Sequence, residues 1–377
     1  MKIEEFTLER IQSLYENTVE LNLSDSGVHP LSLDDLLSED EFAELRALEL
    51  GYGWTNGAVS LRQSISDLYV DCGPDGVIVT NGSAEANFLM VMSLLEPGDE
   101  IIVFTPNYLQ IWGWARAIGV SARAVPLKEE LDWEPDLEEL KTLITPRTKL
   151  ITICHPNNPT GAVLSSEKMR ALSEIAADND IYLHADEVYK GSELEGPETV
   201  SFLDLYDKAF VTNGLSKAMA LPGLRIGWLA GPVETIYAAW QRKDYTSITT
   251  SALSEYVAER VLRPETRQKI LNRSKKILRE NLSLLADWVT ANPDDVSLIH
   301  PKAGGMAFVR YLRDINSTEL AHALRKEKGV LILPGDVYGL DGFIRIGIGS
   351  PREHLEPGLA RISEYLQAKA TTLAVAG

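Results

Sequence analysis

The chain has 377 residues, of which 45% are hydrophobic and 24% charged, and its formal net charge is −19 at pH 7. This composition is that of an ordinary globular protein, long enough for two domains or one large α/β domain. The negative charge argues against nucleic acid and anionic membranes as partners, because both bind cationic surfaces.

The two cysteines, Cys72 and Cys154, form neither a C-x-x-C pair nor a metal-ligand spacing with the six histidines. We therefore expect no metal site, and a reducing compartment. The amino terminus is charged and amphipathic, and no run of residues approaches the roughly 18 apolar positions that a membrane span needs. The sequence predicts a cytoplasmic protein with no membrane partner.

The amino-terminal part predicts an arm followed by a helix. Between residues 1 and 18, hydrophobic side chains recur at roughly helical spacing, which indicates an amphipathic arm that docks on another part of the protein. A helix is expected from Glu39 to Leu50, with Ser38 as its N-cap. In the segment between them, His29 is either a substrate contact or a histidine that caps a turn.

Several apolar segments, each followed by small or polar residues, predict the buried strands of an α/β sheet. They cover residues 76–80, 100–108, 149–154, 181–189 and 209–212. Ligands of open α/β sheets bind outside the carboxyl ends of the strands. The candidate ligand-binding residues at these ends are Gly82, Ser83, Ala84, Tyr108, Asn158, Asp186, Tyr189 and Lys217.

The turn at Gly82, Ser83 and Ala84 opens a helical stretch from Glu85 to Leu95. Such a turn presents free backbone N–H groups and the positive end of the helix dipole, and both attract phosphate. The sequence therefore predicts a phosphate cradle at these three residues.

Lys217 lies in a turn of small residues after the strand at 209–212, and Arg225 leads the next apolar strand. Burial lowers the pKa of a lysine, so that its amine becomes a nucleophile toward an aldehyde. A solvated lysine in a surface turn is the alternative, and it is the commoner case for a lone lysine.

The carboxy-terminal part alternates strands and helices. A helical pattern extends to Ala291, and Pro264 ends or kinks it. Strands are expected at 303–310, from 330 and from 342, and Arg345 lies on the last of these, which is otherwise apolar. A buried arginine needs an anion, and its planar guanidinium suits an α-carboxylate; a structural salt bridge is the alternative.

The string N-G-L-S-K-A-M-A-L-P-G-L-R-I-G-W from Asn213 to Trp228, with N-P-T-G at residues 158–161 and Asp186, resembles fold-type I pyridoxal phosphate (PLP) enzymes. Among these enzymes, it resembles specifically the class I and II aminotransferases of the aspartate aminotransferase superfamily. It implies that Lys217 forms a Schiff base with the cofactor aldehyde and that Asp186 keeps the pyridine nitrogen protonated. Tyr189 is the third implied catalytic residue.

The resemblance also implies contacts to the cofactor and to the substrate. Tyr108 stacks on the pyridine ring, Asn158 and Tyr189 donate to its O3′, and Tyr52 reaches the phosphate of the neighbouring subunit. The complete implied cofactor set is Tyr52, Gly82, Ser83, Ala84, Tyr108, Asn158, Asp186, Tyr189, Ser216, Lys217 and Arg225. The implied substrate contacts are Arg345, which holds the α-carboxylate, together with Asn158 and Gly27.

The implied α/β fold has a large domain with a mostly parallel seven-stranded sheet flanked by helices, and a small α/β domain. Residues 1–42 form an arm that belongs to the small domain, residues 43–265 the large PLP-binding domain, and residues 266–377 the rest of the small domain. The implied assembly is a homodimer with shared active sites.

The expected activity is transfer of an amino group from an L-amino acid to a 2-oxo acid. A shorter string, S-x-S-G-V-H from Ser24 to His29, is similar to the capreomycidine synthase branch, and it leaves open a PLP-dependent lyase, cyclase or hydroxylase acting on an arginine-like amino acid. A PLP-sensing regulator is a third hypothesis, but such proteins carry a basic amino-terminal DNA-binding module, whereas a short acidic arm stands here.

Overall fold

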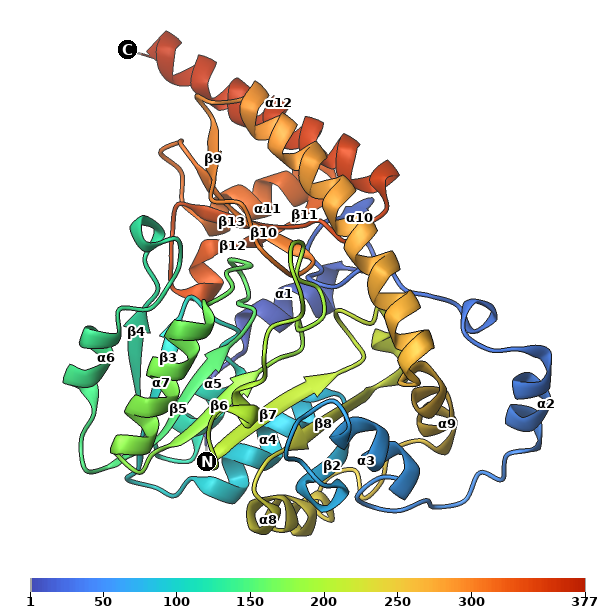
Figure 1. Ribbon diagram of the computed structural model, residues 1–377. Coiled ribbons are helices and arrows are strands. Elements are labelled where there is room, and N and C mark those ends of the chain that lie inside the picture. The colour runs from blue at the N-terminus through green and yellow to red at the C-terminus, as the bar shows by residue number, and fades with distance from the viewer. Residues whose placement is uncertain (1, 377) are drawn as a thin grey trace.

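The computed structural model describes residues 2–376, and side chains up to residue 369. Its centre is a seven-stranded sheet in the order β2-β8-β7-β6-β5-β3-β4 (Figure 1). The strands are β2 (Val77–Asn81), β3 (Glu100–Thr105), β4 (Ser121–Pro126), β5 (Thr148–Cys154), β6 (Tyr182–Asp186), β7 (Ala209–Gly214) and β8 (Ile226–Ala230). Only β8 runs against its two neighbours, which confirms the predicted mostly parallel sheet.

Both faces of this sheet are covered, because alternate residues of each strand point to opposite faces. On one face Ile101 and Val103 pack with α4 (Ser83–Leu94), α5 (Gln110–Ala117) and α8 (Val233–Lys243). On the other, Ile102 and Phe104 pack with α6 (Leu137–Leu143) and α7 (Ser166–Asp178). Further along this face, α3 (Val59–Ser66) and α9 (Ala252–Val261) cover β2 and β8.

A second, smaller sheet lies above the first in Figure 1. Its four antiparallel strands are β12 (Leu333–Pro334), β13 (Phe343–Gly347), β10 (Met306–Tyr311) and β9 (Val296–Leu298), in that order. The short strands β1 (Leu21–Asn22) and β11 (Val330–Leu331) pair in parallel beside it. The helices of this part are α10 (Pro264–Ala291), α11 (Ser317–Lys328) and α12 (Arg352–Ala376).

Pro264 ends the helical pattern rather than kinking it. Helix α9 stops at Val261, and α10 begins with Pro264 in its first turn, where the missing N–H is no loss. Helix α10 then runs from the large sheet up to the second sheet (Figure 1). The division of the chain at residues 42 and 265 stays a prediction.

The amino-terminal arm folds into α1 (Thr7–Tyr15), and α2 spans Glu39–Ala47. The side chain of Ser38 accepts from the N–H of Glu41, as its predicted role as N-cap requires. Short 3₁₀ turns occur at Leu33–Asp35, Pro74–Gly76, Glu129–Leu131, Phe202–Asp204, Pro222–Leu224 and Gly335–Tyr338.

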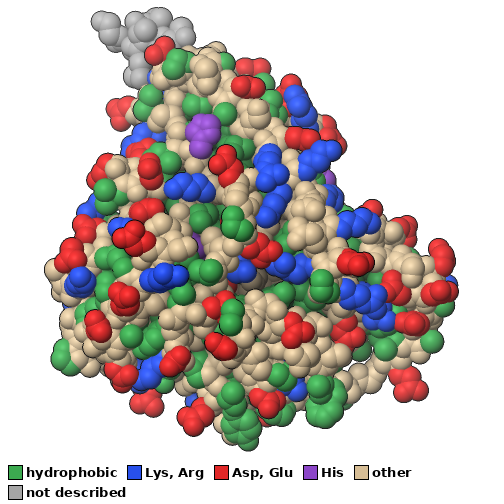
Figure 2. Space-filling model, viewed as in Figure 1, with side chains coloured by type: hydrophobic (Ala, Val, Ile, Leu, Met, Phe, Trp, Pro, Cys, Tyr) green, Lys and Arg blue, Asp and Glu red, His purple; other side chains and the backbone are tan. Residues whose placement is uncertain are grey.

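Acidic and basic side chains are interspersed over the face of the molecule in Figure 2. Among the described residues, no helix has both the length and the apolar character that crossing a membrane requires.

Candidate active site

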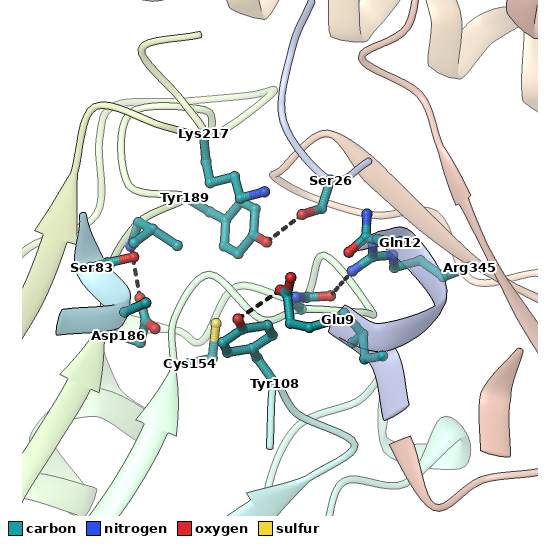
Figure 3. A pocket seen from close by; sticks show the side chains of 14 residues that line it. Glu9, Gln12, Ser26, Ser83, Tyr108, Cys154, Asp186, Tyr189, Lys217 and Arg345 are labelled. Atoms are coloured by element: carbon teal, nitrogen blue, oxygen red, sulfur yellow. Dashed lines mark hydrogen bonds between the residues drawn. The ribbon is translucent and has the colours of Figure 1, made fainter. Parts of the chain in front are cut away.

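A cavity lies where the carboxyl ends of the large-sheet strands meet α1 and β13 (Figure 3). Residues from all three parts of the chain line it: Leu8, Glu9, Gln12, Ser26, Ser83, Ala84, Tyr108, Cys154, Asn158, Asp186, Val188, Tyr189, Lys217 and Arg345. Eight of the residues predicted from the sequence to bind cofactor or substrate are therefore gathered around one space: Ser83, Ala84, Tyr108, Asn158, Asp186, Tyr189, Lys217 and Arg345.

Asp186 is the last residue of β6, and it is buried at the floor of the cavity. Its carboxylate accepts from the amide of Asn87 and from the N–H of Val188, both at 3.3 Å. These neutral donors do not offset the loss of hydration, and burial raises the pKa of Asp186 to about 6. A cationic ring nitrogen would supply the charge that this carboxylate lacks.

His184 does not support Asp186. Its two ring nitrogens lie 2.9 Å from the hydroxyl of Thr152 and 3.0 Å from that of Thr212. It is therefore a hydrogen-bonded core histidine, and burial lowers its pKa to about 3.

Lys217 follows β7 and is more open than predicted. Its side chain is 30% exposed, and its Nζ lies 3.2 Å from Oδ1 of Asp25. The structure therefore does not show the fully buried lysine that the sequence led us to expect. Asp25 is itself fixed by the N–H groups of Ser26 (2.6 Å) and Gly27 (3.0 Å), and Lys217 lowers the pKa of Asp25 to about 2.

The turn predicted to hold phosphate is shaped for an anion. Helix α4 begins at Ser83 without a side-chain cap, and Gly82 has φ +81°. A Cβ at Gly82 would lie 2.9 Å from Cζ of Arg225, so the guanidinium covers this turn directly. A helix amino terminus and an arginine thus converge on one cradle. Ser216, half-buried beside Lys217, does not line the cavity, and its phosphate contact stays a prediction.

Tyr108 and Tyr189 carry the hydroxyl groups nearest the centre of Figure 3. Tyr108 donates to Oε1 of Glu9 at 2.7 Å, and its ring meets that of Phe6 edge-on at 4.9 Å. Tyr189 donates to the hydroxyl of Ser26 at 2.8 Å. Both tyrosines thus join the large sheet to the amino-terminal segment.

Arg345 is the most deeply buried charge of the cavity, with 1% of its surface exposed. Its Nη1 donates to Oδ1 of Asn158 at 2.9 Å and its Nη2 to the carbonyl of Ser24, while its Nε has no partner. Neither partner carries a charge, so these contacts do not form the structural salt bridge considered as an alternative. A buried guanidinium with an unsatisfied donor is a site for an anionic ligand.

Five predicted residues lie outside the cavity lining: Gly82 and Ser216, described above, and Tyr52, Gly27 and Arg225. Tyr52 is 85% exposed, in a surface groove formed by residues 50–52 and 249–253. Gly27 packs beside the turn that carries Lys217, where a Cβ would lie 3.5 Å from Cδ of that lysine. Arg225 lies against Gly82 at the rim. His29, left open by the sequence, has its Nδ1 3.1 Å from the carbonyl of Gly349 and also lies outside the lining.

The sequence reasoning missed Glu9, Gln12 and Asp25. A signal existed, because Glu9, Gln12 and Glu16 are spaced i, i+3 and i+7 and share one face of the arm. The hydrophobic residues of the arm were noticed and this polar face was not. Nothing in the spacing of Asp25 indicates that it would meet a lysine 192 positions away.

Known proteins resemble this chain over nearly its whole length. The family model described as aminotransferase class I and II matches residues 37–362. Capreomycidine synthase from Streptomyces vinaceus is 32% identical, covering 92% of this chain and 89% of its own length. Aspartate aminotransferase from Thermotoga maritima is 28% identical, with 88% and 87% covered. The crystal structure of a PLP-dependent aminotransferase from Streptococcus suis superposes with a TM-score of 0.92 at 34% identity, covering 98% and 99%.

Proposed function

Since the chain belongs to the class I and II aminotransferase family, we propose that it transfers the amino group of an L-amino acid to a 2-oxo acid. Its cofactor is pyridoxal 5′-phosphate, and its fold is that of fold-type I PLP enzymes. The observation that carries the proposal is one cavity that holds an amine on Lys217, a buried carboxylate with a raised pKa on Asp186 and a guanidinium on Arg345 whose Nε has no partner.

The residues present fit this cofactor. The cradle formed by Gly82, Ser83, Ala84 and Arg225 would hold its phosphate, and Asp186 would pair with its ring nitrogen. When bound, pyridoxal phosphate supplies an aldehyde that takes up amines and a ring that accepts the electron pair left at a substrate carbon.

Lys217 is the residue we propose as both anchor and proton carrier. Its Nζ would hold the cofactor, and after a substrate amine replaces it, the same nitrogen would take the proton from the substrate Cα. Asp186 would keep the ring nitrogen protonated, because its buried carboxylate gains most from a cationic neighbour.

Arg345 and Asn158 would orient the substrate. The guanidinium would take the α-carboxylate through its free Nε–H, while Oδ1 of Asn158 holds the arginine in place at 2.9 Å. Because Oδ1 accepts from Arg345, the NH₂ group of Asn158 remains for the predicted donation to the cofactor, which Tyr189 would share. Fixing the carboxylate sets which bond of Cα faces the ring.

We also propose a homodimer with shared active sites. Tyr52 lines a surface groove and is 85% exposed, and Tyr245 is 92% exposed. Large exposed aromatic side chains suit a partner surface. A variant forced to be monomeric is expected to lose PLP, since the phosphate would lack Tyr52 of a second copy. Tight PLP binding by such a monomer, measured by absorbance titration, would contradict this.

A cytoplasmic location is part of the proposal. Its support is the two cysteines, Cys72 and Cys154, which are both free. Free thiols persist in reducing compartments.

Single-turnover absorbance spectroscopy tests the reaction type. The holoenzyme is mixed with L-amino acids in the absence of any 2-oxo acid, while released ammonia and oxygen uptake are assayed. An aminotransferase yields one 2-oxo acid per site, without ammonia, and then stops. Continued turnover with ammonia, oxygen uptake or a cyclic product contradicts transamination and leaves the cofactor assignment intact.

The second candidate is a PLP-dependent lyase, cyclase or hydroxylase that acts on an arginine-like amino acid. Its support is the 32% identity with capreomycidine synthase over 350 residues. The same experiment separates the two candidates, because only the second continues to turn over without a 2-oxo acid.

A further inference from the structure

The loop at residues 23–29 brings a carboxylate to Lys217. Oδ1 of Asp25 lies 3.2 Å from Nζ of Lys217. The same oxygen accepts from the N–H groups of Ser26 at 2.6 Å and Gly27 at 3.0 Å, so the backbone of its own turn fixes the carboxylate. Asp25 therefore contacts the nitrogen that we propose as anchor of the cofactor and as proton carrier.

Two further contacts hold this loop in place. The N–H of Gly305 donates to the carbonyl of Ser26 at 3.1 Å, and Tyr189 donates to the hydroxyl of Ser26 at 2.8 Å (Figure 3). These contacts come from the segments that follow β6 and precede β10. They set the position of Asp25, so its attraction to Lys217 is not needed to place it.

The charged groups around Lys217 differ in how they reach it. Among the residues that the structure describes, Asp25 is the carboxylate that forms an ion pair with it. Asp186 and Glu16 interact with the charge of Lys217 through space, and Arg345 acts in the same way on Asp25. Asp25 stays ionised, because Lys217 lowers the pKa of Asp25 to about 2. A carboxylate in contact with an amine stabilises the ammonium relative to the neutral amine.

The two tasks proposed for Lys217 need different charge states at Nζ. Attachment of the cofactor forms a bond between Nζ and the aldehyde carbon and releases water, and it needs the neutral amine. Proton transfer breaks the Cα–H bond of the substrate and forms an N–H bond, so Nζ ends as an ammonium, while the electron pair passes to the cofactor ring. A fixed carboxylate beside Nζ slows the first task and favours the second.

We propose that Asp25 is the counter-ion that holds Nζ of Lys217 whenever this nitrogen is not attached to the cofactor, and that it stabilises the ammonium formed by proton transfer. Asp25 takes no proton itself and acts through Lys217, as a positioning residue. The inference rests on the proposed function, since it assigns the surroundings of the same lysine. It does not depend on which amino acid is bound.

The cofactor-free protein gives a readout that needs no turnover. Asp25→Asn removes the charge and keeps the turn, because an amide Oδ1 still accepts from the N–H groups of Ser26 and Gly27. Acetic anhydride modifies neutral amines, and peptide mass spectrometry reports its rate at Lys217. Asp25→Asn should raise this rate at pH 7 by about fivefold, a moderate effect because both side chains of the pair are partly exposed. An unchanged rate would overturn the inference.

With the cofactor, Asp25→Asn should change two rates in opposite directions. Attachment to Lys217 at saturating PLP, followed by absorbance, should become about fivefold faster. Proton transfer from the L-amino acid that reacts fastest with the wild type is measured at a pH above which the rate no longer rises. It should become about threefold slower, because only part of the positive charge has reached Nζ in the transition state.

Slower reaction of the α-deuterated amino acid shows that proton transfer is the step observed. A merely structural role of Asp25 would lower both rates together. Two rates that fall together, or that do not change, would overturn the inference and leave the proposed function standing.

Two variants serve as controls. Asp180→Asn removes another aspartate–lysine ion pair, that with Lys208, and should leave all three rates as in the wild type. Glu16→Gln removes a charge that acts on Lys217 through space, so its effects should be smaller than those of Asp25→Asn. Equal effects would assign the rates to general negative potential and overturn the pairing. If the wild type neither attaches PLP nor reacts with any amino acid, the proposed function fails, and the acetic anhydride rates alone decide the pairing.

Discussion

One wall of the cavity comes from a single sheet, and the opposite wall comes from segments far apart in the chain. Asp186 is the last residue of β6, and Lys217 follows the neighbouring strand β7 of the large sheet. Glu9 belongs to α1, while Arg345 of β13 donates to the carbonyl of Ser24, which lies over 300 residues away in the chain. We call the first the cofactor wall, because it carries the groups proposed to hold the cofactor. We call the second the substrate wall, because it carries those proposed for the substrate.

The difference shows how one scaffold can keep its chemistry and change its substrate. Parallel pairing fixes the strand ends relative to one another, so a change at one end disturbs the others. The substrate wall depends on how α1 docks, and of the nine residues in this helix only Leu8 is fully buried. Substitutions there cost little packing, and so the substrate wall can vary while the cofactor wall stays fixed.

The largest expected effect breaks the cofactor wall at Lys217. Lys217→Ala should lower turnover by at least about 10⁴-fold, because the anchor and the proton carrier are lost together. Borohydride reduction followed by peptide mass spectrometry should show the cofactor attached at residue 217 in the wild type and no attachment in the variant. Lys276→Ala, at an exposed position of α10, should behave as the wild type. Attachment at another lysine would contradict the assignment.

The next largest effect is expected for Asp186→Asn, which should lower turnover while it stabilises the apo protein. The folded pKa of about 6 exceeds the ordinary 3.8, so the folded chain binds this proton more tightly than the unfolded chain. The carboxylate therefore costs the apo protein stability above pH 6, and this cost vanishes below about pH 4. Asp186→Asn should stabilise apo protein by about 3 kcal/mol at pH 8, while turnover falls by about 10²-fold or more.

Urea unfolding of the apo forms at pH 4 and pH 8 checks this prediction. The difference between variant and wild type isolates Asp186, because the buried carboxyl of Glu187, whose pKa is raised to about 7, is common to both. If the difference in free energy of unfolding between Asp186→Asn and wild type is the same at both pH values, burial does not raise the pKa of Asp186.

A change at Arg345 breaks the substrate wall. Arg345→Lys should raise KM for every reactive amino acid by about 10²-fold, because a lysine lacks the planar guanidinium whose Nε–H is proposed to hold the carboxylate. Primary amines without a carboxylate should lose nothing further in the variant. Arg352→Lys, at an exposed position, is the matched control. Unchanged KM values would show that Arg345 does not bind the substrate carboxylate.

The smallest expected effect is a Cβ added at the phosphate cradle. In Gly82→Ala the alanine would have to adopt a φ of +81°, and its Cβ would clash with the guanidinium of Arg225. The dissociation constant of PLP should therefore rise by about tenfold. Gly73→Ala is the control, because a Cβ there meets nothing within 4 Å. Equal PLP affinity in both variants would show that the turn at Gly82 does not hold the phosphate.

The strand ends of the cofactor wall could be predicted because local sequence determines them. The apolar runs before Gly82, Asn158, Asp186 and Lys217 are strands, and parallel pairing brings their ends to one edge. The family resemblance then supplied the role of each residue. Short sequence motifs were thus sufficient to predict the residues of the cofactor wall.

The substrate wall could not be predicted because no short stretch encodes it. The contact between Asp25 and Lys217 spans 192 residues, and the packing of Glu9 against Tyr108 spans 99. Such contacts depend on docking of the arm, which an amphipathic pattern indicates without giving its orientation. The partial exposure of Lys217 could not be predicted for the same reason, since its neighbour Asp25 comes from the amino-terminal segment.

The dissociation constant of PLP, measured by absorbance titration in three proteins, tests the division between the two walls most directly. Asp186→Asn should weaken PLP binding by about tenfold or more, whereas Arg345→Lys should leave it within about twofold of wild type and change only KM. Loss of PLP affinity in Arg345→Lys as large as in Asp186→Asn would contradict the account, because both walls would then hold the cofactor.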